Sequence, residues 1–189
     1  MNKKIIVSAL GLSFSGAVFA QAGTVQRDVN QQQRIEQGLQ SGQLNTREAS
    51  RLEREEAKVE RDQARALQDG KLSPAEKARL AREQNKVSRD IYREKHDAQT
   101  GNPNSPSSQR MQADVQRDVN QQRRIEQGVR SGELNNREAA RLERGQAHDS
   151  AIQARAGADG HVSAQEQRRI RKSENKQSRR IHREKHDAQ

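Results

Sequence analysis

The sequence overlays itself when it is shifted by 90 residues, and this tandem duplication constrains the fold more than any other feature. Residues 26–99 align with residues 116–189 without a gap, and 45 of the 74 positions are identical. Both copies should therefore form the same local structures. The segment 100–115 between them is rich in Gly, Asn, Pro and Ser and lacks apolar periodicity, so we expect a flexible linker there.

A shorter repeat inside each copy predicts where helices end and begin. In it, Gly is followed three residues later by Asn or Ser, and after three more residues by Glu. The four instances are Gly42-Asn45-Glu48, Gly70-Ser73-Glu76, Gly132-Asn135-Glu138 and Gly160-Ser163-Glu166. Gly readily adopts the left-handed conformation that follows many helices, and Asn or Ser with a later Glu forms a capping box. The pattern therefore predicts three helices in copy one, over 25–40, 46–68 and 74–96.

Apolar side chains recur at helical spacing in these segments, but they are sparse. Leu, Ile, Val and Phe account for 22 of the 167 residues after position 22, which is below the fraction of about 20% that marks many disordered chains. We expect an all-α protein of two tandem three-helix repeats, 23–99 and 116–189, with a marginal core and partial disorder. No Cys, no patterned Ser-His-acid set and no phosphate loop after a strand is present, so we do not expect an enzyme.

The first 22 residues have the pattern of a secretory signal peptide. Lys3 and Lys4 precede an apolar stretch that ends in small residues, which favours cleavage after Ala20 or Ala22. The stretch is shorter than the roughly 20 residues that span a bilayer. We therefore expect a periplasmic protein that is released from the membrane.

One dense acidic run suggests a metal site. Glu53, Glu56 and Glu60 fall on one face of the second predicted helix, at spacings of three and four residues. Carboxylates gathered in this way can share a hard cation. The alternative is a solvated face whose charges pair with interspersed Arg and Lys. Copy two has lost most of this run.

Histidines show the opposite asymmetry and suggest a second, softer site. His182 and His186 lie four residues apart on a predicted helix, so both imidazoles can face one copper, silver, nickel or zinc ion. His148 with Asp149 is a further candidate pair. The turns resemble only the second half of a calcium loop, because Arg65 and Leu67 occupy two of its ligand positions, so calcium is not expected.

Basic residues concentrate in copy two, which carries a formal charge of +6 against +2 for copy one. In a cytoplasmic protein this excess would indicate nucleic-acid binding. Because we expect export, we do not expect nucleic acid as a partner. Anionic envelope components, lipopolysaccharide or phospholipid head groups, are the alternative partners.

The blocks 31–53, 69–80 and 88–99, with their second copies, resemble a group of small exported proteobacterial proteins of the PrsQ type. The resemblance implies a periplasmic protein linked to silver and uranyl stress, and it implies no ligand residues. We therefore expect a non-enzymatic protein that binds or buffers metal ions in metal or envelope stress. A cationic adaptor and a structural protein that orders on self-association (a homo-oligomer) are the alternatives.

Overall fold

The computed structural model describes residues 15–187, with side chains from residue 21 onward, and all its regular structure is helical. The six helices are α1 (Ser15–Ser41), α2 (Thr46–Ala66), α3 (Pro74–Lys95), α4 (Pro106–Ser131), α5 (Asn136–Ala156) and α6 (Ala164–His186). No strand occurs in this part of the chain, which confirms the all-α prediction. Most of the predicted signal peptide, residues 1–14, lies outside the described residues. Within the described range, no helix combines the length and apolarity needed to cross a membrane.

The four predicted turns are confirmed. Asn45, Ser73, Asn135 and Ser163 each cap a helix, and each forms a reciprocal capping box with the Glu three residues on. The glycines before them adopt φ angles from +76° to +91°, a region that L side chains rarely enter. The local signals thus act alike in both copies.

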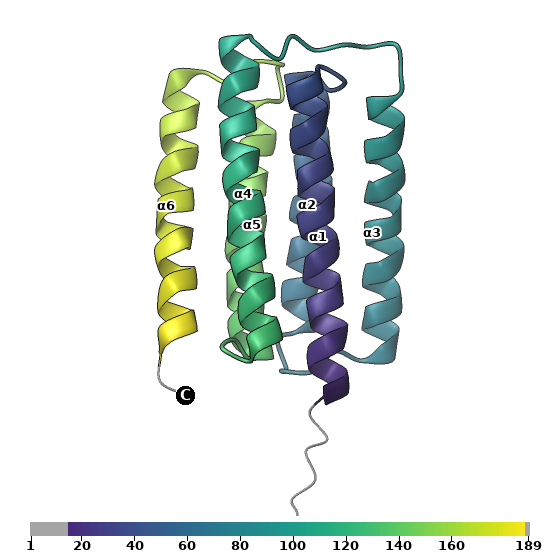
Figure 1. Cartoon of the computed structure of the whole chain (residues 1–189), viewed down its shortest axis with the longest axis vertical. Helices are drawn as coiled ribbons and strands as arrows, with labels where there is room; N and C mark the ends of the chain where they lie inside the picture. The colour runs from purple at the N-terminus through teal and green to yellow at the C-terminus, as the bar shows by residue number, and fades with distance from the viewer. Residues whose placement is uncertain (1–14, 188–189) are drawn as a thin grey trace, which may run out of the picture.

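The two copies pack into one bundle and do not form separate units (Figure 1). Helices α1, α2, α4 and α5 fill the middle, with α3 and α6 on opposite flanks. The most extensive interhelical packing joins α2 to α5 and α1 to α4, so each copy buries its apolar stripe against the other. The expectation of two marginal, partly disordered repeats is therefore wrong for the described residues, because the missing core of each copy is supplied by its duplicate.

The flexible linker predicted over 100–115 is also wrong. Ser105 caps α4 and Pro106 begins it, so most of this segment is helical. Met111 and Val115 are fully buried in the bundle, and they anchor the first turns of α4. In the short remaining connection, the Gly101 amide donates to the Gly42 carbonyl at 2.8 Å.

The apolar core is divided into two clusters at opposite ends of the bundle. One gathers residues from the end of α1, the start of α2 and the start of α4, including Ile35, Leu52 and Met111. The other gathers residues from the opposite ends of α1 and α4, including Val25 and Ile125. Between them the interior of the four central helices is occupied by carboxylates and glutamines.

Candidate metal site in the bundle interior

Six carboxyl side chains occupy the polar middle of the bundle, and we call them the interior carboxylates. They are Asp28 of α1, Glu53, Glu56 and Glu60 of α2, Asp118 of α4 and Glu143 of α5. Each is at most 1% exposed to solvent. Four helices from both copies thus direct acidic groups into one region, an arrangement that helical bundles use to build metal sites.

Neutral side chains donate the hydrogen bonds that these carboxylates receive. Gln122 Nε2 lies 3.1 Å from Glu60 and 3.4 Å from Glu143, so one amide bridges carboxylates of α2 and α5. Ser150 Oγ donates to the second oxygen of Glu60 at 2.9 Å. Gln32 donates to Glu53 in the same way. These donors provide hydrogen bonds to some of the carboxylate oxygens. Because the donors are neutral, they do not compensate the negative charge.

Several interior oxygens have no partner at all. Both carboxyl oxygens of Glu56 are buried without a hydrogen bond, as is one oxygen each of Glu53, Asp118 and Glu143. No Arg, Lys or His of the described chain forms an ion pair with any of the six side chains. A buried, ionised and unpaired carboxylate is strongly unfavourable, so these groups need either protons or a cation.

Burial raises the pKa of every interior carboxylate. The pKa rises to about 7 for Asp28 and for Glu53, mainly because the side chains are removed from water. The pKa values of Glu56 and Glu60 rise further, since their neighbouring carboxylates repel the charged form as well. The same two causes raise the pKa of Asp118 well above its usual range.

The interior carboxylates do not form a preassembled chelate. Among the described residues, no three of them bring ligand oxygens within 4.8 Å of one another. A cation held here would have to draw the carboxylates inward and displace bridging amides such as that of Gln122. Because all the possible metal ligands here are carboxylate oxygen atoms, the residues fit a hard cation better than a soft one.

The structure corrects one alternative from the sequence and extends the predicted acidic set. Glu53, Glu56 and Glu60 do lie together, but all three are fully buried, so a solvated face is wrong for them. Asp28, Asp118 and Glu143 were missed as partners. The available signal was the position of Asp28 in line with Val25 and Ile35, where a polar residue interrupts an apolar helical stripe.

The predicted histidine sites are only partly brought together. His182 and His186 are exposed on α6, with stacked rings whose centroids are 4.2 Å apart, and His186 Nδ1 is 2.7 Å from the His182 carbonyl oxygen. His148 is exposed on α5, and the adjacent Asp149 is buried and accepts a hydrogen bond from Ser173. No described group of three potential ligands within 4.8 Å includes a histidine.

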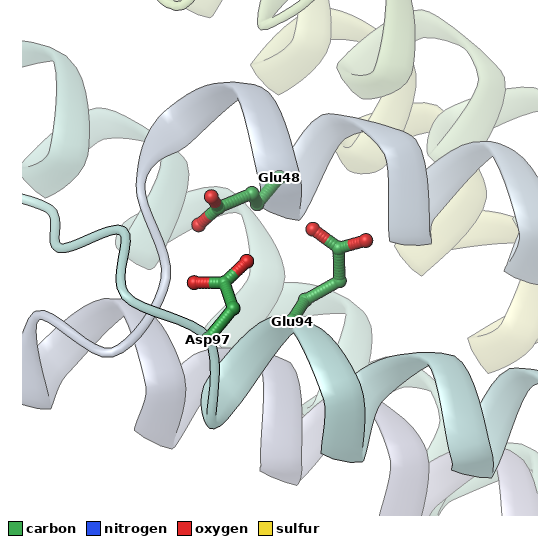
Figure 2. Close-up of side chains that lie close together, drawn as sticks. All are labelled: Glu48, Glu94 and Asp97. Atoms are coloured by element: carbon green, nitrogen blue, oxygen red, sulfur yellow. The ribbon is translucent and has the colours of Figure 1, made fainter.

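A smaller acidic cluster lies near the end of the bundle where α2 begins and α3 ends. Figure 2 shows Glu48, Glu94 and Asp97 directed toward one another, and their ligand oxygens all lie within 4.8 Å of each other. Glu48 is 1% exposed, and one of its oxygens accepts from the Asn45 amide while the other has no partner. From the sequence, only a capping role is predictable for Glu48.

Copy two neutralises the corresponding cluster. Glu184 is the counterpart of Glu94, and Glu138 is the counterpart of Glu48. Arg141 donates a hydrogen bond to Glu184 at 2.7 Å and lies 4.0 Å from Glu138. The equivalent basic residue in copy one is Arg51, which forms no ion pair in the described structure. The cluster in copy one therefore keeps more of its negative charge and is the better preformed surface site for a cation.

No protein-family model matches the chain, and no curated protein or solved structure shows significant similarity to it.

Proposed function

We propose that this chain is a non-enzymatic, exported binder of hard metal cations that acts in metal or envelope stress in the periplasm. The observation that carries the proposal is the set of six interior carboxylates, none of which forms an ion pair with a basic side chain of the described residues. Bound cations would neutralise that charge at pH values where protons no longer do so. The signal peptide predicted from the first 22 residues supports the location, and the resemblance to PrsQ-type proteins supports the physiological role.

Two further metal assignments belong to the same proposal. The Glu48–Glu94–Asp97 cluster is a surface site for the same class of oxygen-seeking cation. The pair His182 and His186 is a separate, weaker site for silver or copper, because two imidazoles alone make an incomplete ligand set. The proposal requires the interior carboxylates to supply the tightest site for a hard cation.

Isothermal titration of the metal-free mature chain tests the proposal, with terbium(III), manganese(II), uranyl, copper(II) and silver(I) as ligands. The critical variant is the double substitution Glu56→Gln and Glu60→Ser, which places in copy one the residues found at the equivalent positions of copy two, Gln146 and Ser150. Because copy two tolerates both residues, the variant should fold, which circular dichroism would verify.

The matched control is Glu94→Gln with Asp97→Asn, which removes two acidic side chains from the surface cluster. We expect the interior variant to lose the tightest hard-cation event and the control to keep it. Binding by the unaltered chain that is no tighter than millimolar would overturn the proposal. Equal binding by the interior variant and the unaltered chain would remove the interior site from it.

A further inference from the structure

A pocket of about 470 Å³ opens between α5 and α6 on the copy-two side of the bundle. Its wall carries five basic side chains, Arg61, Arg144, Arg155, Lys176 and Arg180, and His148. Arg61 reaches the pocket from α2, so the wall combines residues of both copies. The volume lies in the range typical of small-molecule sites, about 300–1,000 Å³.

None of these five basic side chains has an ion-pair partner in the described structure. The one carboxylate in the wall, Asp149, is buried and accepts a hydrogen bond from Ser173. Four of the five basic side chains, by contrast, are exposed. An anion that enters from solvent would therefore meet guanidinium and ammonium groups, whereas the Asp149 carboxylate is shielded from solvent.

The corresponding face of copy one carries ion pairs that copy two lacks. There, four carboxylates on α2 and α3 form eight ion pairs with surrounding basic side chains, at nitrogen–oxygen distances of 2.5–3.4 Å. The four carboxylates are those of Glu55, Asp62, Glu83 and Asp90, and their basic partners are Lys58, Arg65, Arg79, Lys86 and Arg93. Copy one thus neutralises this surface internally.

All four acidic positions differ in copy two, whereas four of the five basic positions keep the same Arg or Lys and the fifth holds His148. The acids are replaced by Gly145, Ile152, Ser173 and Arg180. The five basic positions hold His148, Arg155, Arg169, Lys176 and Arg183. Three of these four residues carry no side-chain charge and the fourth is basic, so the surface that is self-neutralised in copy one has a cationic excess in copy two.

We propose that this pocket binds the phosphate groups of a polyphosphorylated or phosphomonoester ligand. Guanidinium groups bind phosphate oxygens through paired, charge-assisted hydrogen bonds, and several of them around one mouth suit a ligand with more than one negative charge. This inference does not depend on metal binding. It assigns His148 to an anion site, which disagrees with its assignment as a metal ligand beside Asp149.

Calorimetric titration with inorganic tripolyphosphate at about 0.15 M salt tests the pocket, because diffuse surface attraction is largely screened there. The pocket variant is Arg144→Gln with Arg180→Asp, and the second change restores the acidic residue of copy one. The matched control is Arg54→Gln with Arg89→Asp, which changes the net charge equally on the exposed surface of copy one. Circular dichroism would confirm that both variants keep their helices.

We expect the pocket variant to bind tripolyphosphate about tenfold more weakly or worse, as the loss of one charge-assisted hydrogen bond predicts, and the control to bind as the unaltered chain does. Equal weakening in both variants, or no binding by the unaltered chain, would overturn the proposal.

Sedimentation with vesicles distinguishes the sources of phosphate. If vesicles containing phosphatidic acid, but not phosphatidylcholine alone, sediment the unaltered chain and not the pocket variant, the ligand is a lipid head group. Tripolyphosphate binding without vesicle binding identifies a soluble phosphate. Either result supports a phosphate site.

Discussion

Replacing Glu53 by Gln should stabilise the metal-free protein far more at pH 8 than at pH 5. Burial raises the pKa of Glu53 from 4.5 to about 7. An acid whose pKa is raised on folding destabilises the fold increasingly as pH rises from its unfolded pKa to its folded pKa, and the full cost is present above the folded pKa. At pH 8 this amounts to about 3 kcal/mol, and at pH 5 to about 1 kcal/mol or less. Glutamine removes the titration, and its carbonyl oxygen can still accept the hydrogen bond of Gln32.

The assay is thermal unfolding followed by circular dichroism at both pH values, with a chelator present so that no cation compensates the charge. For a chain of this size, a difference of about 2 kcal/mol corresponds to about 4–8 °C in Tm. The increase in Tm that Glu53→Gln produces at pH 8 should exceed the increase that it produces at pH 5 by about 4–8 °C. Asp69→Asn, in an exposed turn, is the control and should show no such difference. An equal Tm shift at both pH values would show that folding does not raise the pKa of Glu53, and would contradict the prediction.

Three other predictions follow from the packing and the site. Gly157→Ala should destabilise the fold by about 1–3 kcal/mol in urea titration, because the added Cβ would lie 3.1 Å from the backbone oxygen of Thr46 and closer still to two side chains. Asn135→Ala should lower the unfolding free energy by about 1 kcal/mol by removing the α5 cap; an unchanged value would contradict the capping assignment. Substituting His182 and His186 together by Ala should abolish weak silver binding and leave terbium affinity unchanged in the same calorimetric titration.

Local structure was predictable from the sequence because its signals are short-range. The capping pairs, such as Asn45 with Glu48, act within one turn of helix, and they place the starts of α2, α3, α5 and α6. The sequence does not predict the start of α4, because Pro and Ser near position 105 are equally typical of a flexible linker. In the structure the same residues cap a helix whose stability depends on burying Met111 and Val115 against the other copy.

Only the part of the candidate site that lies on α2 is predictable from the sequence, because it too depends on short-range geometry. Glu53, Glu56 and Glu60 share a helix face at fixed spacing, so their proximity follows from helical geometry alone. Their burial and the approach of Asp118 and Glu143 depend on how α4 and α5 pack, which no periodicity in one copy specifies. In this chain, polar residues inside sparse apolar stripes lie in the interior of the bundle. Their burial becomes evident only from the way in which the two copies pack together.

The most direct test of the central claim is a crystal structure of the mature chain grown with terbium, with the ion located by anomalous scattering. We expect a strong peak in the middle of the bundle, within coordination distance of Glu56 and Glu60 and of a carboxylate from α4 or α5. Peaks confined to the Glu48–Glu94–Asp97 cluster or to other surface positions, with the interior carboxylates still hydrogen-bonded to their glutamines, would contradict it.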